Sequence, residues 1–284
     1  MTDTRFKRIE KKKTQELISY DHSVWKDIKK ELFSNKIALV SIIILLIIII
    51  ASILAPLSPY DPNKINVAEK LQGISAKHIF GTDEYGRDYF TRALYGGRIS
   101  LTVGFCSMIM TVILGTAIGI TSGYFGGKVD MFLMRFTEIF GAIPFLPFAM
   151  ILSALMAQMD ISENEKIFIL MVILGLLSWT GLARLVRGQI LLAREQEYVT
   201  AAKAMGLRES RIAFRHILPN IVSVIFVTLT LDFATCMLTE STLSYLGFGV
   251  TYPRPTWGNM LNGANNSTVI KNFWWRWLFP AIFL

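Results

Sequence analysis

A run of 19 residues without a charged side chain, 37–55, constrains the fold of this chain more than any other feature. As an α-helix, the run would be about 28 Å long, close to the roughly 30 Å hydrocarbon core of a lipid bilayer. Apolar residues make up 52% of the sequence, and they come in blocks rather than at the short periods of a soluble domain. The sequence therefore predicts a polytopic membrane protein, and it excludes a soluble enzyme, a disordered tail and a nucleic-acid-binding protein as leading interpretations.

Further blocks with few charges predict the other membrane spans. These blocks lie at residues 99–121, 139–157, 167–186 and 221–243, and a sixth begins near Trp274. From Trp274 to the last residue, a helix would reach only about 16 Å, which is too short to cross. We therefore expect an all-α helical bundle with six transmembrane helices, of which the sixth is truncated in this sequence.

The distribution of basic residues predicts the orientation of the spans. With the N-terminus in the cytoplasm, about two thirds of the 29 Lys and Arg residues lie in cytoplasmic segments, as the positive-inside rule requires. The net charge of +8 is thus interpreted as a topology signal and not as a surface for nucleic acid. The resulting segments are a cytoplasmic tail at 1–36, a first transmembrane helix at 37–55, an extracytoplasmic segment at 56–98, and a core at 99–284 with a cytoplasmic loop at 187–220.

The tail itself has an amphipathic stretch. Val24, Trp25, Ile28 and Leu32 share one face of a helix, opposite a group of lysines. Such a stretch predicts a helix that lies at the cytoplasmic membrane interface. A solvated basic tail is the alternative interpretation.

The sequence lacks the motifs with which a membrane transporter would hydrolyse ATP. The P-loop pattern fails at residues 122–129, because Val129 stands where Ser or Thr is required and Ser122 where Gly is required. Zinc-protease, nucleophile-elbow and dinucleotide patterns are also absent from the sequence. We therefore expect no catalytic residue and no cofactor on this chain.

Metal and ion chemistry also find little support in the sequence. Both cysteines, Cys106 and Cys236, lie in apolar blocks, and the three histidines are too far apart for a metal-ligand motif, so we expect no metal site. Asp232 lies near the middle of a predicted span, with Glu240 nearer its outer end. Two acidic groups are weak support for a relay of protons or sodium ions through the membrane.

The predicted cytoplasmic loop is the most informative segment. A helix is expected over 189–205, with Gly206 as the left-handed residue that stops it. A second short helix is expected over 208–218, ended by Pro219. The small side chains of Ala201 and Ala202 would let a partner approach the backbone closely, although an ordinary amphipathic hairpin is the alternative.

This loop resembles the EAA motif of the permease subunits of bacterial ABC importers, in which a short coupling helix sits in a cleft on the ATPase. The chain from about residue 30 to 284 resembles the second, C-type permease of the dipeptide, oligopeptide and nickel importers. The similar stretches are His78–Asp83, Gly86–Asp88, Tyr95–Leu101, Gly123–Gly127 with Asp130 and Met134-Arg135, Glu240–Gly249, Pro253, Pro255 and Trp257-Gly258. One departure is Thr200, which stands where the motif often has Glu.

The resemblance implies the fold of a type I ABC importer permease in the bacterial cell membrane. It implies a heterodimer with a second permease, two ATPase subunits that hold ATP and magnesium, and an extracytoplasmic substrate-binding protein. The implied cargo is a di- or oligopeptide, with nickel or a metal chelate as the alternative within the family. An ion-coupled secondary transporter and a non-transporting scaffold that recruits an ATPase remain as alternatives of other classes.

Three groups of candidate site residues follow from the resemblance and from the residue types. Coupling to the ATPase is expected from Thr200, Ala201, Ala202, Gly206, His216, Leu218 and Pro219. The translocation path is expected to involve Pro144, Pro147, Asp232 and Glu240. Contact with the binding protein or the second permease is expected from Asp83, Arg87, Asp88 and Trp257.

Each group also has a purely structural interpretation. Leu218 and Pro219 would simply end a helix, Pro144 and Pro147 would kink a span, and Asp232 would bond to a neighbouring helix. The acidic residues near position 83 would form a solvated loop. Gly115, Gly119 and Gly123 recur every four residues, which predicts close packing of the second span against another.

Overall fold

The computed structural model describes residues 35–284, so the interfacial helix expected at 24–32 lies outside the described residues. The described residues fall into two units, 35–47 and 48–284. In the first unit, the structure describes the beginning of α2 (Lys36–Ile53). The Asn35 side chain accepts hydrogen bonds from the backbone N–H groups of Ile37 and Ala38, which satisfies donors that a helix start leaves free.

The second unit is helical almost throughout. Its helices are α3 (Tyr89–Phe125), α4 (Gly127–Ala142), α5 (Phe145–Ala157), α6 (Glu163–Arg194), α7 (Glu197–Ala204), α8 (Glu209–Ile212), α9 (Leu218–Tyr245), α10 (Trp257–Gly263), α11 (Ser267–Asn272) and α12 (Trp275–Phe283). Short 3₁₀ turns span Ala55–Leu57 and Val67–Glu69, and a π-helical turn spans Ala213–Ile217. No strand occurs between residues 35 and 284.

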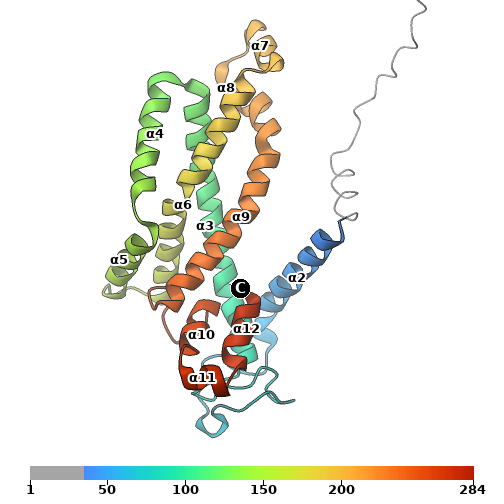
Figure 1. Cartoon of the computed structure of the whole chain (residues 1–284), viewed down its shortest axis with the longest axis vertical. Helices are drawn as coiled ribbons and strands as arrows, with labels where there is room; N and C mark the ends of the chain where they lie inside the picture. The colour runs from blue at the N-terminus through green and yellow to red at the C-terminus, as the bar shows by residue number, and fades with distance from the viewer. Residues whose placement is uncertain (1–34) are drawn as a thin grey trace, which may run out of the picture. The chain divides into compact units, whose positions relative to one another are not determined.

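Within this unit, α3, α4, α6 and α9 lie side by side, as Figure 1 shows. Helix α7 caps one end of this bundle, called here the α7 end, and α10, α11 and α12 gather at the other, called here the α10 end. Helix α3 packs along α6 and α9. Three apolar clusters fill the interior: one near α7, one between α3, α5, α6 and the end of α9, and a small one where α3 meets α10.

Four helices of the described chain are long and apolar enough to cross a membrane, namely α2, α3, α6 and the helix that continues from Arg215 to Tyr245. The α4–α5 pair makes a fifth if its two parts count as one span. This confirms the predicted all-α polytopic membrane fold. Helices α3 and α6 extend well beyond the predicted spans at 99–121 and 167–186. The predicted spans end at the first charged residues, whereas a helix can continue through charged residues outside the membrane.

The predicted span at 139–157 is not a single helix. Helices α4 and α5 meet at a bend of 74°. Pro144 has no N–H to donate and disfavours helical backbone at Ile143, which is extended with ψ of 123°. The kink is therefore confirmed at Pro144, whereas Pro147 lies in the first turn of α5, where a missing donor breaks no helical bond.

The predicted glycine stripe lies where α3 packs closely against α6. A Cβ atom added at Gly115 would lie 2.9 Å from the Leu182 side chain, and one at Gly119 would lie 2.7 Å from the Ala183 carbonyl oxygen. Gly123 meets the α6 backbone in the same way, at 2.9 Å. Only hydrogen at these positions lets the two helices approach so closely, which confirms the predicted packing role.

Candidate functional site

The site expected to couple to a partner is built around α7, and its first half folds differently from the sequence prediction. Instead of one helix over 189–205, α6 ends at Arg194, Gln196 is extended, and α7 begins at Glu197. This break turns Val199 and Ala202 back into the apolar cluster at the α7 end, where both are almost fully buried. In one straight helix, Val199 and Ala202 would not lie on the same face as the buried Ala193, so the three side chains could not all be buried.

Gly206 ends α7 as predicted. Its φ of +76° lies in the left-handed region, which glycine adopts without steric cost. The Gly206 N–H donates to the Lys203 carbonyl at 2.9 Å, and the Leu207 N–H donates to that of Ala202 at 3.3 Å. These bonds satisfy carbonyl groups that the end of a helix leaves free.

The second half of the loop corrects the role predicted for Pro219. The chain continues from α8 through the π-helical turn directly into α9, with Pro219 in the first turn of that helix. Proline is tolerated there because its missing N–H is not needed. Pro219 therefore opens α9 instead of ending the preceding helix, and together with the half-buried His216 and Leu218 it lies where the loop joins the bundle.

The outer face of α7 is exposed and made mostly of small side chains. Thr200, Ala201 and Ala204 lie on this face. Met205, at the end of the helix, is 72% exposed, which is unusual for a large apolar side chain. We call this set of four residues the α7 face. At Ala201 and Ala204, a partner could approach this face to backbone distance, and Met205 offers an apolar contact beside them.

Tyr124, in the last turn of α3, holds α7 and α8 in place. Its hydroxyl group hydrogen bonds to the Glu209 carboxylate. The charged ends of Arg194 and Lys203 lie 5.7 and 5.9 Å from the centre of its ring, within range of cation–π attraction. One aromatic ring thus connects α3, α6, α7 and α8.

An ion pair between α4 and α6 stabilises the same end of the bundle. Arg187 of α6 donates to both carboxylate oxygens of Asp130 of α4, at 2.5 Å each. Ser122 of α3 bonds to the same carboxylate, and Arg194 donates to the Gly123 carbonyl at 3.0 Å. Two-pronged Arg–carboxylate pairs are among the stronger polar contacts in proteins. Together with the Tyr124–Glu209 bond, these contacts connect α3, α4, α6 and α8 at the end of the bundle that carries the α7 face.

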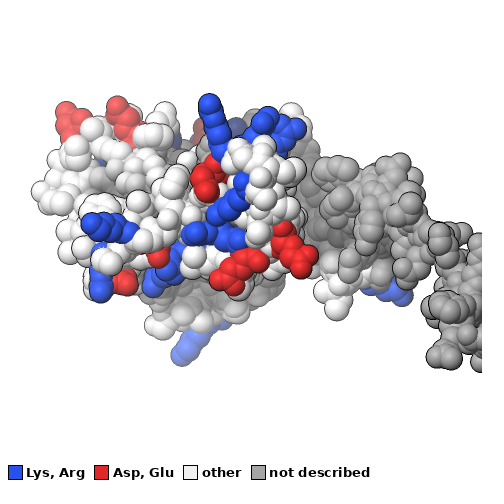
Figure 2. All heavy atoms as spheres, turned by 90° about the horizontal axis from the view of Figure 1, so that it is seen from above, with Lys and Arg blue, Asp and Glu red and all other residues white. Residues whose placement is uncertain are grey.

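Tyr124 and Asp130 belong to stretches that resemble the permease family, but the sequence alone indicates no role for either residue. Their partners lie 85 and 57 residues away in the chain. The available signal was an acidic residue and a tyrosine beside a glycine-rich helix end. Figure 2, which views the α7 end, shows that Lys and Arg lie beside Asp and Glu there, so this surface carries both signs of charge.

Among the expected path residues, Asp232 has the most unusual surroundings. It is half-buried in the middle of α9, and its Oδ2 atom is buried without a hydrogen-bond partner among residues 35–284. A charged carboxylate at the centre of a membrane helix costs about 2.5–3.5 kcal/mol on insertion scales. A buried carboxylate oxygen without a partner is unusual in proteins, and it singles out Asp232 among the path candidates.

Asp232 belongs to a polar stripe along α9. Thr228, Asp232, Thr235, Thr239 and Thr242 recur at steps of four and three residues, which places them on one face. Each threonine hydroxyl donates to a carbonyl one turn earlier, at 2.7–3.0 Å. The hydroxyl oxygens and the carboxylate thus remain free to accept hydrogen bonds, and the stripe suits a ligand or a partner that donates them.

Glu240 is placed differently from the expectation that it lines a path. Its side chain is fully buried. Ser100 of α3 donates to one carboxylate oxygen at 2.9 Å, and Ser244 donates to the other at 2.7 Å. A buried carboxylate requires such donors, and these come from this chain itself. The structure therefore favours a role in joining α3 to α9.

The residues expected to contact a partner at the other end are buried as well. Arg87 pairs with Asp83 at 2.6 Å, and Asp88 accepts from the Thr91 N–H at the start of α3. Trp257 donates from its indole to the Ala93 carbonyl at 2.9 Å. All four candidate side chains are at most 6% exposed, so direct contact with a partner does not fit their burial. Asp83, Arg87 and Asp88 stabilise the loop and the start of α3, and Trp257 joins α10 to α3.

The segment before α3 is closed by a further polar cluster. His78 is buried, with its Nδ1 atom 2.8 Å from Asp88 and its Nε2 atom 3.4 Å from Glu69. A hydrogen bond from the Lys77 ammonium holds the pKa of Glu69 below its usual range. These contacts hold the loop between α2 and α3 in one conformation.

Comparison with known proteins agrees with this architecture. Residues 115–284 match the family described as binding-protein-dependent transport system inner membrane component, and residues 23–73 match the N-terminal TM domain of oligopeptide transport permease C. The whole chain is 38% identical to the oligopeptide transport system permease protein OppC of Haemophilus influenzae, over 93% of that protein. Over 91% of its length, it is 40% identical to the dipeptide transport system permease protein DppC of Alkalihalophilus pseudofirmus, over 83% of that protein.

Proposed function

This chain belongs to the family of binding-protein-dependent transport system inner membrane components, and from that premise we propose that it is a permease subunit of an ATP-driven importer of peptides. Two of its relatives carry the names of oligopeptide and dipeptide permeases. These names favour di- or oligopeptides over nickel or a metal chelate as the cargo. The chain contributes a path through the membrane and no covalent chemistry.

The observation that carries the proposal is the α7 face. Val199 and Ala202 anchor α7 in the core, and Tyr124 connects it to α3, α6 and α8. A displacement of α7 by a partner would therefore be transmitted to the bundle. The exposed side of α7 carries the small side chains of Ala201 and Ala204, which would let the helix fit into a cleft on another protein. ATP binding and hydrolysis on that protein can drive the permease only if the partner binds one permease conformation better than the other.

The proposed assembly has four kinds of subunit. This chain pairs with a second permease, two ATPase subunits hold ATP and magnesium, and an extracytoplasmic protein delivers the peptide. In the bacterial cell membrane, the N-terminus and the α7 end face the cytoplasm. The excess of Lys and Arg in the tail and in the segments around α7 supports this orientation.

We place the translocation path along the polar stripe of α9, next to the second permease. Asp232 and the stripe threonines would then face water or peptide instead of lipid, which removes the cost of a carboxylate in hydrocarbon. Peptides present N–H groups and an ammonium group, which match a surface of hydrogen-bond acceptors. Pro144 and Pro147, at the bend between α4 and α5, are exposed and would border this path.

Uptake by the reconstituted complex tests the proposal. Proteoliposomes that contain both permeases, both ATPases and the binding protein are expected to accumulate radiolabelled dipeptide or oligopeptide when ATP is supplied at the ATPase side. Accumulation should stop when the ATPases are omitted and should survive an ionophore. Uptake by this chain alone that collapses with the ionophore would instead support an ion-coupled transporter. Uptake of nickel without peptide would identify the other branch of the family.

A further inference from the structure

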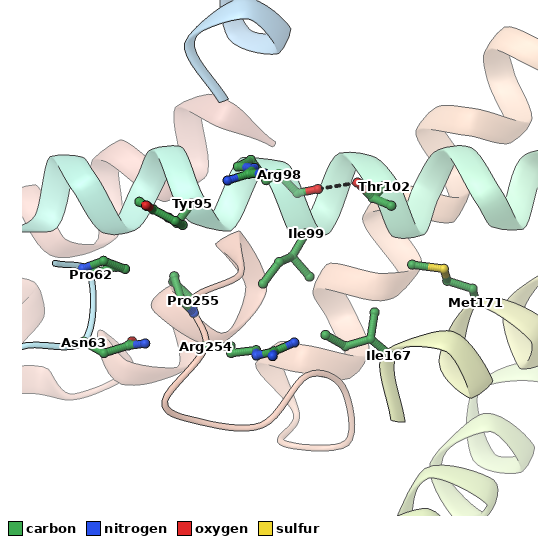
Figure 3. Close-up of a pocket in the computed structure, with 10 residues that line it drawn as sticks. All are labelled: Pro62, Asn63, Tyr95, Arg98, Ile99, Thr102, Ile167, Met171, Arg254 and Pro255. Atoms are coloured by element: carbon green, nitrogen blue, oxygen red, sulfur yellow. Dashed lines mark hydrogen bonds between the residues drawn. The ribbon is translucent and has the colours of Figure 1, made fainter. Parts of the chain in front are cut away.

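A pocket of about 520 Å³ opens near the α10 end of the bundle. Figure 3 shows that α3, the start of α6, and two loops surround it. Its lining combines two arginines with apolar side chains of α3 and α6. No function described so far uses this space.

The charged side chains that line the pocket are all positive. Arg98 and Arg254 contribute two cations to the lining, and none of the lining residues is acidic. Among residues 35–284, the exposed Arg98 guanidinium has no ion pair or hydrogen bond, and it lies 5.8 Å from the centre of the Tyr95 ring. Arg254 donates to the Asn164 side chain at 2.6 Å, which leaves most of its donors free.

One acidic group outside the lining acts on Arg254 through its charge. Glu163, at the start of α6, accepts a hydrogen bond from Thr251 at 2.6 Å and pairs with Lys166 at 3.1 Å. Its charge is therefore already shared with two other groups, and it does not line the pocket. The lining therefore carries positive charge that Glu163 offsets only from outside the pocket, and this charge favours a negatively charged ligand.

The remaining walls determine what kind of anion fits. Ile99 of α3 and Ile167 and Met171 of α6 contribute apolar side chains to the lining, and Ile167 lies beside Arg254 in Figure 3. Tyr95 and Asn63 add polar groups at the loop side. A ligand with both an anionic oxygen group and an apolar group could bind the arginines and cover the apolar side chains. A small inorganic anion would leave the apolar side chains exposed to water.

We propose that this pocket binds the C-terminal carboxylate of the peptide on its way into the membrane, with Arg98 and Arg254 as its partners and the apolar wall against the last side chain. This inference rests on the proposed function, in which the α10 end faces the side from which peptide arrives. Guanidinium groups bind carboxylates through two parallel hydrogen bonds. A lipid phosphate offers the same anionic oxygens, so the test must separate the two sources.

The test compares a peptide with its C-terminal amide in the reconstituted complex. Arg98→Gln and Arg254→Gln remove one charge each at similar size, and Lys271→Gln, at an exposed cation of α11, is the matched control. For each variant, the ratio of uptake efficiency between peptide acid and peptide amide is measured with the same binding protein. Preferences of the binding protein then cancel between variants.

We expect each arginine variant to lower the acid-to-amide ratio about tenfold, as loss of one charged hydrogen-bonding partner implies. Uptake of the amide should stay near that of the unchanged complex, and Lys271→Gln should leave the ratio unaltered. An unaltered ratio in both arginine variants would refute the proposal. An equal loss for acid and amide would also refute it, because the arginines would then serve folding alone.

The lipid source is tested in the same vesicles. Uptake is measured in phosphatidylcholine with and without phosphatidylglycerol. If the arginine variants abolish a dependence on phosphatidylglycerol while the acid-to-amide ratio stays fixed, the pocket binds a lipid phosphate and the proposal is wrong. If the unchanged complex imports no peptide in any vesicle, the proposed function fails and this inference fails with it.

Discussion

Replacing Ala201 by tryptophan is expected to reduce ATP-driven uptake about tenfold or more, while the amount of folded permease in the membrane stays the same. Ala201 is exposed on the α7 face, so a larger side chain meets no atom of this chain's core. Against a closely fitting partner it would act as an overpacked residue, which costs about 1–3 kcal/mol. Each 1.4 kcal/mol corresponds to about a tenfold loss of affinity.

Ala157→Trp is the matched control for this prediction. Ala157 is also exposed, but it lies at the end of α5, away from α7 in Figure 1. Uptake, ATPase activity of the complex and co-purification of the ATPase subunits are measured for both variants. Normal uptake by Ala201→Trp would show that the α7 face is not a contact surface. A loss of folded protein in Ala201→Trp would point to packing instead of docking.

Replacing Gly119 by leucine is expected to destabilise the permease by about 3 kcal/mol, because the α3–α6 contact has no room for a side chain. The first added carbon would lie 2.7 Å from the Ala183 carbonyl oxygen and 2.7 Å from the Val186 side chain. Neither atom is the end of a flexible side chain, so the helices themselves must separate. The apparent melting temperature should fall by roughly 10 °C.

Gly181→Leu is the control, because a carbon added at Gly181 on α6 meets nothing within 4 Å. Thermal stability of both variants in detergent, followed by size-exclusion chromatography, checks the prediction. Gly119→Leu should lose its monodisperse peak at the lower temperature, whereas Gly181→Leu should match the unchanged protein. Equal stability of the two variants would contradict the close approach of α3 and α6.

Part of this fold is readable from local sequence because membrane insertion depends on local sums of hydropathy. The apolar blocks therefore predict helices α2, α3, α6 and α9. Gly206 and Pro144 act through their own backbone, so the end of α7 and the bend before α5 were also predictable. The glycine stripe at 115–123 was predictable because its spacing alone defines a smooth helix face.

Other features depend on contacts that local sequence does not contain. The break at Glu195–Gln196 exists because Val199 must reach a core formed by distant helices. The loop is a docking candidate by its sequence, but its exposed face is defined only once Ala202 is seen to be buried. Burial likewise decides that Asp83 is an internal ion-pair partner instead of a surface contact. Charge in a sequence does not reveal whether its partner lies in the same chain.

The account as a whole depends on α7 being the contact through which another subunit moves this permease. A photo-cross-linking amino acid at position 205, at the exposed end of the α7 face, tests this most directly in the active complex. We predict an adduct with a nucleotide-hydrolysing subunit whose yield changes when ATP is trapped, and no such adduct from position 157. A complex that imports peptide but gives no adduct from any position of the α7 face would contradict the account.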